Sequence, residues 1–334
     1  MKKLAIGVDI GGINTAFGLV DEQGDIFAES VISTRKYPFV EDYPTYVKDL
    51  CAAMRALADS LTFEYELAGI GIGAPNANFH KGTIEAPVNL WRAHGTETDP
   101  TGRIFPLAAE VSHAFGGIPV RITNDANAAT IGEMVYGNAR GMRDFVMITL
   151  GTGLGSGFVA NGEMIYGHDG FAGEFGHVCV VRDGRACGCG RRGCLETYVS
   201  ATGIKRTVFE LMATMNEPSK LRATAFDDFD ALMVSQAAAQ GDPIALEAFR
   251  FTGEMLGRAL ADAVTITSPE AIFLFGGLAK AGELLFEPTR RYMEENMLHM
   301  FKNKVKLLPS GIQDKNAAIL GSAALIWQTQ AKQA

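Results

Sequence analysis

The stretch that decides the fold is DFVMITLGTGLGSGFVANGEMIYG, residues 144–167. It consists of an apolar run, a glycine-rich turn, a second apolar run, a turn at ANGE and a third short strand. Residues 3–32 follow the same order, as KLAIGVDI, GGIN, TAFGLVD, DEQGD and IFAESVI. The chain therefore carries one β-turn-β-turn-β repeat twice, about 140 residues apart, which predicts two similar domains.

The segments between and after the repeats alternate between helix and strand. The expected elements are helix 44–60, strand 67–75, helix 106–115, strand 118–123, helix 125–136, a helix that begins at Asp242-Pro243, strand 271–277 and a closing helix 316–327. Such alternation predicts α/β layers. We expect a smaller N-terminal domain over 1–123 and a larger domain over 124–315. The closing helix, about 316–330, is expected to pack back on the first domain.

Composition restricts the classes of function. The chain has 334 residues, of which 47% are hydrophobic and 20% charged, and a net charge of −8. A mildly acidic protein repels phosphate backbones, so we expect no nucleic-acid partner. Asp9 interrupts the apolar start and no long apolar span follows, so we expect a cytoplasmic protein without a membrane partner. In such a reducing compartment, clustered cysteines are more often metal ligands than disulfides.

Three glycine turns follow buried strands: DIGG (9–12), LGTGLGSG (150–157) and FGG (275–277). Glycine lets the backbone approach a ligand and point N–H groups at it, although one such turn alone is equally typical of a plain hairpin. Together they predict a site for a nucleoside triphosphate with Mg²⁺ near Asp9. No Walker A motif is present. The residues expected at this site are Asp9, Gly11, Gly12, Asn14, Gly151, Thr152, Gly153, Gly276 and Gly277.

A carboxylate follows the strand PVRI in TNDANAA, residues 123–129. Asn124 and Asp125 therefore lie at a strand end, where open α/β sheets bind ligands. Asp125 also begins a helix, so an N-cap is one interpretation. The other is a general base that takes the proton of a substrate hydroxyl during phosphoryl transfer. Both roles are compatible.

A histidine and three cysteines have the spacing of a closed metal site. His177 in GEFGH is followed by Cys187, Cys189 and Cys194 in CGCGRRGCLE, residues 187–196. Four N/S ligands complete a tetrahedral Zn²⁺ site, so the metal would be structural; a disulfide or unrelated thiols are the alternatives. Cys51 and Cys179 are interpreted as small buried residues.

Two acids flank this loop, Glu174 and Glu196. Carboxylates accept hydrogen bonds from vicinal hydroxyls, and the second ring nitrogen of a zinc-bound histidine is free to contact an outer-shell group such as a sugar hydroxyl. Plain surface acids are the alternative interpretation.

Together, DIGG, LGTGLGSG, NDANAA, GEFGH and CGCGRRGCLE resemble the ROK family (repressors, open reading frames, sugar kinases) of the sugar kinase/Hsc70/actin superfamily. The resemblance covers essentially the whole chain. It implies a two-domain actin-like ATPase (ribonuclease H-like) fold of α/β class with a zinc-braced loop. It also implies an ATP-dependent hexose kinase that forms a homodimer, with Asp125 as base at the sugar 6-hydroxyl. The sugar contacts implied are Gly73, Asn89, Asn124, Asp125, Glu174, His177 and Glu196.

One position departs from the family pattern. Ile13 stands where a threonine usually follows DIGG, and an isoleucine side chain donates nothing to a phosphate. Backbone N–H groups or Thr15 are the expected substitutes. The first expected strand starts near Leu4, which favours the kinase branch over repressors with an N-terminal helix-turn-helix.

Glucose is the expected substrate. An N-acetylmannosamine or N-acetylglucosamine kinase, a fructokinase and a non-catalytic sugar sensor remain alternatives. The intact NDAN argues against the sensor, and Ile13 favours it.

Overall fold

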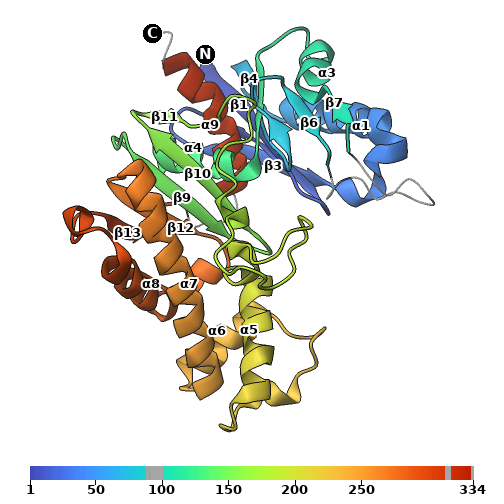
Figure 1. Cartoon of the computed structure of the whole chain (residues 1–334). Coiled ribbons are helices and arrows are strands. Elements are labelled where there is room, and N and C mark those ends of the chain that lie inside the picture. Colours follow the sequence, from blue (N-terminus) through green and yellow to red (C-terminus); the bar gives the residue numbers. More distant parts are fainter. Residues whose placement is uncertain (88–89, 91–100, 313–316, 332–334) are drawn as a thin grey trace. The chain divides into compact units, whose positions relative to one another are not determined.

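The computed structural model describes residues 1–87, 90, 101–312 and 317–331. It divides into two compact units. The first unit comprises Met1–Gly141, Met164–Ala172 and Gly311–Ala334, and the second comprises Met142–Glu163 and Gly173–Ser310. Each unit is built around one five-stranded sheet (Figure 1).

The two sheets have the same strand order. The first unit has the order β3-β2-β1-β4-β8, from β1 (Lys2–Ile10), β2 (Thr15–Val20), β3 (Ile26–Ile32), β4 (Tyr65–Gly73) and β8 (Val120–Thr123). The second has β11-β10-β9-β12-β13, from β9 (Phe145–Leu150), β10 (Leu154–Ala160), β11 (Glu163–Met164), β12 (Ala271–Phe275) and β13 (Lys306–Pro309). In each sheet the two strands that come first in the chain are antiparallel, namely β1 with β2 and β9 with β10. Strands β4 and β8 run parallel to β1, and strands β12 and β13 run parallel to β9. The repeat predicted from the sequence is confirmed, as is the α/β fold class.

Helices cover both faces of the first sheet because the side chains of β1 alternate. Leu4, Ile6 and Val8 are fully buried in one core cluster together with α1 (Phe39–Asp59) and α3 (Leu107–Ala114). Ala5 points to the other face, where it lies in a second cluster with residues of α9 (Ala317–Ala331). Helix α4 (Asp125–Tyr136) packs against α9.

Glycines allow α9 to lie directly on the strands. A Cβ added at Gly7 would stand 2.0 Å from the carbonyl oxygen of Ile319, and one at Gly71 would stand 1.8 Å from that of Ser322. No side chain fits at either position, so β1 and β4 contact the helix backbone. The C-terminal helix therefore belongs to the first unit.

Short elements complete the first unit. A small three-stranded sheet and one 3₁₀ helix consist of β5 (Ala77–Asn78), β6 (Thr83–Glu85), β7 (Ile104–Phe105) and η1 (Thr34–Lys36).

In the second unit, α7 (Pro243–Thr267) is the central helix and packs against α8 (Glu283–Asn296). Its start is as predicted, because Asp242 Oδ1 accepts the N–H groups of Ile244 and Ala245, both at 3.1 Å. The remaining elements are α5 (Ala201–Thr214), α6 (Ala231–Ala239), η2 (Phe175–His177), η3 (Leu195–Thr197), η4 (Lys220–Ala223), η5 (Leu278–Ala281) and η6 (His299–Phe301).

Two boundaries differ from those expected. The first division between units falls after Gly141 instead of near Thr123, because α4 packs on α9 of the first unit. Helix α1 begins at Phe39, five positions before the proline taken as its start, so Pro44 lies inside the helix. Within the described ranges, no helix has the length and apolar character needed to cross a membrane.

Candidate functional site

Strand register places two predicted positions of the first unit, Asp9 and Gly73, in one row with Thr123. Asp9 on β1 pairs with Gly73 on β4, and Gly73 pairs with Thr123 on β8. The three strands are parallel, so this row marks the carboxyl edge of the sheet, where α/β sheets bind ligands. Asn124 and Asp125 follow Thr123 directly. The sheet therefore brings Asp9, Gly73 and the NDAN segment to one edge.

The first turn of α4 shows which residue is the N-cap of the helix, a role that the sequence analysis considered for Asp125 together with that of general base. Asn124 is the N-cap, and its Oδ1 accepts the N–H of Ala126 at 2.8 Å. Asp125 is the first helical residue, and its Oδ1 accepts the same N–H at 2.8 Å. The N-cap interpretation of Asp125 is thus wrong: Asn124 caps the helix, and the Asp125 carboxylate is oriented by the first turn.

Both carboxyls at this edge hold their protons more tightly than ordinary aspartates. Burial raises the pKa of Asp9 from 3.8 to about 6, and repulsion from Asp125 contributes. Loss of hydration also raises the pKa of Asp125, although the hydrogen bond from Ala126 opposes the change. Two acids that lie close enough to repel each other favour the binding of a cation at this edge of the sheet.

The DIGG turn is closed by a hydrogen bond from the Gly11 N–H to the Asn14 carbonyl, 2.9 Å long. The side chain of Ile13 is 63% exposed, so it takes no part in the core. Asn14 is also exposed and free to face a ligand. Thr15 is fully buried, and its hydroxyl lies 2.8 Å from the hydroxyls of both Thr34 and Tyr46. The expectation that Thr15 substitutes for the missing threonine is therefore wrong.

In the second unit, two glycine turns lie side by side at the end of neighbouring parallel strands. Thr149 on β9 pairs with Phe275 on β12, so the turns at Gly151–Gly153 and Gly276–Gly277 follow adjacent positions. Gly276 has φ +100, and a Cβ there would stand 2.6 Å from the Leu150 carbonyl oxygen. Only glycine fits that backbone, because a side chain at Gly276 would collide with the neighbouring strand end.

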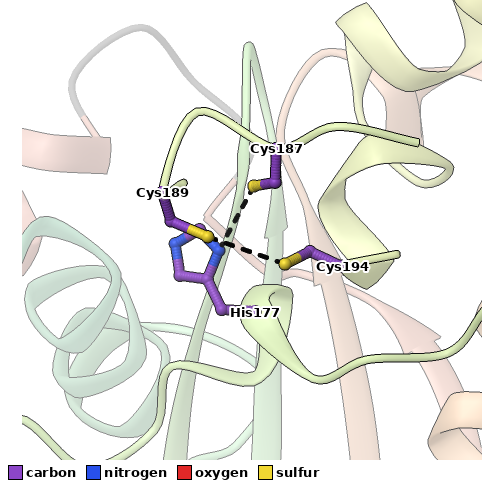
Figure 2. A group of neighbouring side chains, drawn as sticks. All are labelled: His177, Cys187, Cys189 and Cys194. Carbon is purple, nitrogen blue, oxygen red and sulfur yellow. Dashed lines mark hydrogen bonds between the residues drawn. The ribbon is translucent and has the colours of Figure 1, made fainter. Parts of the chain in front are cut away.

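The four predicted metal ligands lie together in the second unit (Figure 2). Their ligand atoms all lie within 4.8 Å of one another. Cys187 Sγ is 3.7 Å from His177 Nδ1, and Cys189 Sγ is 3.6 Å from Cys194 Sγ. Sulfur atoms 2.3 Å from a tetrahedral zinc ion are about 3.8 Å apart, so these two separations are close to those of a zinc site.

Three short segments carry these ligands. His177 ends η2, Cys194 is the N-cap of η3, and the other two cysteines lie on the glycine-rich loop between them. Burial raises the pKa of the Cys187 thiol to about 12, so its thiolate form requires a nearby cation. Because His177 turns Nδ1 towards the sulfurs, Nε2 remains for a second partner.

The two acids differ in their contacts. Glu174 is exposed just before η2, and its carbonyl oxygen accepts the N–H of His177 at 3.0 Å. Glu196 is half-buried, and its Oε2 accepts the N–H of Leu154 at 2.9 Å. Its Oε1 lies 3.8 Å from Cys187 Sγ. Glu196 therefore contacts both the metal cluster and the end of the glycine turn at Gly151–Gly153.

Two further predictions have different outcomes. Asn89 lies outside the described residues. Cys51 is buried as expected, but Cys179 is exposed, so its assignment to the interior is wrong. Cys179 pairs with Cys194 in an isolated β-bridge at the surface of the metal loop.

The segment Met164–Ala172 belongs to the first unit, although the chain on both sides of it belongs to the second, and the sequence analysis does not predict this crossing. Its Tyr166 ring stacks on Phe79 with centroids 4.0 Å apart, and the Asn78 side chain donates to the Asp169 carbonyl at 2.7 Å. Its two glycines, Gly167 and Gly170, both have positive φ, and they are the sequence feature that marks the turns of this segment.

Comparison with known proteins agrees with these features. The ROK family model matches residues 5–329. A glucokinase of Streptomyces coelicolor is 36% identical over 294 residues, covering 86% of each chain. A glucokinase of Thermotoga maritima is 34% identical over 328 residues, covering 98% of each chain. The solved structure of a ROK family glucokinase from Streptomyces griseus, in complex with glucose and AMPPNP, is 32% identical with a TM-score of 0.77 and covers 97% of this chain and 99% of its own. The chain belongs to the ROK family.

Proposed function

We propose that this protein is an ATP-dependent hexose kinase that phosphorylates glucose at the 6-hydroxyl. The proposal is supported by the glucokinases that cover most of the chain at 34–36% identity, one of them nearly end to end. A structure of similar fold holds glucose together with an ATP analogue. Both kinds of predicted site, a carboxylate at a sheet edge and paired glycine turns, are present in this chain.

The observation that carries the proposal is the place of Asp125. It follows the last strand of the Asp9–Gly73–Thr123 row and is oriented by the first turn of α4. Phosphoryl transfer requires a carboxylate held towards the attacking hydroxyl, and little further covalent chemistry from the protein. Asp125 would accept the proton of the sugar 6-hydroxyl as its oxygen bonds to the γ-phosphorus and ADP leaves.

The raised pKa of Asp125 suits this role. A carboxylate with a higher proton affinity is a stronger base, so the raised pKa favours proton transfer from the sugar hydroxyl. Asp9 would bind Mg²⁺, through water molecules, at the same edge; a bound cation supplies charge neutralisation for the phosphates. Gly11, Gly12 and Asn14 would contact the nucleotide from the first unit.

The second unit would supply its own nucleotide contacts, through backbone groups at Gly151, Thr152, Gly153, Gly276 and Gly277. His177, Cys187, Cys189 and Cys194 would hold a structural Zn²⁺, which fixes the glycine-rich loop. The free Nε2 of His177 would then donate to a sugar hydroxyl. Gly73, Asn124, Glu174 and Glu196 would complete the hexose contacts.

A coupled assay of ADP release with a panel of hexoses tests this function. We expect glucose to give the highest kcat/KM, with Mg²⁺ and ATP required. If turnover is highest with an N-acetylated hexosamine or with fructose, that sugar replaces glucose as the proposed substrate. Sugar binding without turnover of any hexose would show a sensor and refute the kinase.

The family resemblance also leads us to propose a homodimer. Size-exclusion chromatography with light scattering should give twice the chain mass of 35.8 kDa. A monomeric mass at the concentrations used for the activity assay would refute it.

A further inference from the structure

The segment Glu196–Thr202, which lies just after the metal ligand Cys194, contacts the glycine turn Gly151–Leu154 along its length. The N–H of Leu154 donates to Glu196 Oε2 at 2.9 Å. The N–H of Ala201 donates to the Gly151 carbonyl at 2.9 Å, and Thr202 Oγ1 donates to the Thr152 carbonyl at 3.0 Å. A single seven-residue segment thus fixes both ends and the middle of the turn.

The other end of the metal cluster reaches the same turn. Gly176 precedes the ligand His177, and a Cβ at Gly176 would stand 2.3 Å from the Leu154 carbonyl oxygen. A Cβ at Gly153 would likewise stand 2.3 Å from Glu196 Oε2. The first approach is to backbone and excludes any side chain at Gly176, and the second brings the end of the Glu196 side chain against the turn. The turn therefore lies against both segments, the one that carries His177 and the one that follows Cys194.

Glu196 connects the two sites most directly. One carboxylate oxygen accepts from the turn, and the other lies 3.8 Å from the sulfur of the metal ligand Cys187. The start of α5 is in turn fixed by Ser200, whose Oγ donates to the Glu196 carbonyl at 2.8 Å and accepts the N–H of Gly203 at 2.9 Å. The contacts therefore form a continuous path from the metal ligands, through Glu196 and the α5 N-terminus, to the turn.

We propose that the metal cluster sets the conformation of the nucleotide turn Gly151–Leu154 through the segment Glu196–Thr202. Metal occupancy then controls nucleotide affinity as well as the order of the metal loop. Thr202 is a positioning residue in this path, since it is exposed and its hydroxyl contacts the Thr152 carbonyl and Ser200 Oγ. The proposal rests on the proposed function in one respect, namely that this turn binds the nucleotide.

The first experiment replaces Thr202 by valine in the zinc-loaded protein, which removes the hydroxyl and keeps the shape. Calorimetric titration should show the Kd for AMPPNP rising roughly 3- to 10-fold, the range expected for one lost hydrogen bond, while the Kd for glucose changes less than about twofold. T202S keeps the donor and should restore nucleotide affinity.

T214V is the matched control, because Thr214 lies at the other end of α5 and its hydroxyl also bonds to a backbone carbonyl, that of Glu210 at 3.1 Å. It should leave both dissociation constants unchanged. Equal losses in T202V and T214V would show a general effect of destabilising α5 and would overturn the proposal, as would unchanged nucleotide affinity in T202V.

The second experiment needs neither nucleotide nor turnover. Hydrogen exchange in the peptide covering residues 149–156 is compared between zinc-loaded and chelator-treated protein. We expect exchange of the Leu154 amide to accelerate at least about 10-fold on metal removal, while the DIGG turn of the first unit stays unchanged. Unchanged exchange at Leu154 after proven loss of zinc refutes the proposal. Should the chelated protein unfold globally, exchange would rise in the DIGG turn as well, and the T202V result then decides.

The two failures are distinguishable. A protein that phosphorylates glucose but shows no response of the turn to zinc retains the proposed function and loses this inference. A turn that responds to zinc in a protein without hexose turnover gives the reverse result.

Discussion

Replacing Asp9 by asparagine should stabilise this protein at neutral pH. The side chain keeps its shape and loses a charge that is costly where it stands. Burial and the nearby Asp125 raise the pKa of Asp9 from 3.8 to about 6, which means that the folded protein disfavours the ionised form. The same substitution removes the proposed Mg²⁺ contact, so stability and activity should move in opposite directions.

The size of the effect follows from linkage. Between pH 3.8 and about 6, the folded state holds a proton that the unfolded state has released, so stability falls as pH rises. Each pKa unit corresponds to about 1.4 kcal/mol, and the ionised group therefore costs about 3 kcal/mol at pH 7. Below pH 3.8 both states are protonated and the cost vanishes. The advantage of D9N should thus grow from near zero at pH 3.5 to about 2–3 kcal/mol at pH 7.

Urea unfolding of wild type and D9N, in zinc-loaded protein without nucleotide, measures this difference at several pH values. Asp21 provides a matched control in the same unit. It is 3% exposed, but its carboxylate accepts the N–H groups of Gln23 and Asp25 and pairs with Lys2 at 3.2 Å. D21N should therefore lose stability at pH 7, because it removes favourable partners from a buried group.

Two results would refute this reasoning. One is a D9N protein no more stable than wild type at pH 7. The other is an advantage of the same size at pH 4 and pH 7, which would show that charge is not its cause. In the coupled assay, the KM for Mg-ATP should rise at least about 10-fold in D9N, and an unchanged KM would remove Asp9 from the metal site.

Three other substitutions test separate features. D125N should lower kcat at least about 100-fold while glucose affinity stays within a few-fold, and near-normal turnover would exclude Asp125 as the base. The raised pKa of Asp125 also predicts that, as the pH is lowered, wild-type kcat/KM begins to fall at a higher pH than it would with an ordinary aspartate. Cys194 is fully buried, so C194S should reduce zinc from about one per chain to substoichiometric amounts by elemental analysis and lower the melting temperature, whereas full zinc content would contradict the site. G71A places a methyl group 1.8 Å from the Ser322 carbonyl oxygen and should cost at least about 2 kcal/mol in urea unfolding, while an unaffected protein would contradict direct contact of α9 with β4.

The sequence was most informative about features that depend on residues close together in the chain. The repeated strand-turn pattern predicted two sheets of one topology, because apolar runs and glycine turns determine strands directly. The spacing of His177 and the three cysteines predicted a cluster for the same reason: short loops bring such ligands together. Asp242 capped its helix as expected, since the cap needs only its own N–H neighbours.

The rest depended on contacts that sequence patterns do not contain. Thr15 has the right side chain for a phosphate, but strand alternation turns it into the core, towards Tyr46. Glu196 was recognised for its distance from Cys194, whereas its contact with Leu154 comes from a turn 42 residues away. The expected helix 44–60 begins at Phe39 instead of Pro44, where the rings of Phe39 and Tyr43 pack together within the core.

The route of the chain between its units has a consequence for biosynthesis. The first unit is completed only by the segment from Gly311, which carries α9 onto β1 and β4. Until that segment leaves the ribosome, the face that holds Ala5 and Val20 lacks the cover that α9 gives it in the folded unit. Most of the second unit, Gly173–Ser310, is already synthesised by then. The nascent chain should therefore complete its C-terminal half before its N-terminal half, the reverse of the usual vectorial order, with an apolar sheet face available to chaperones meanwhile.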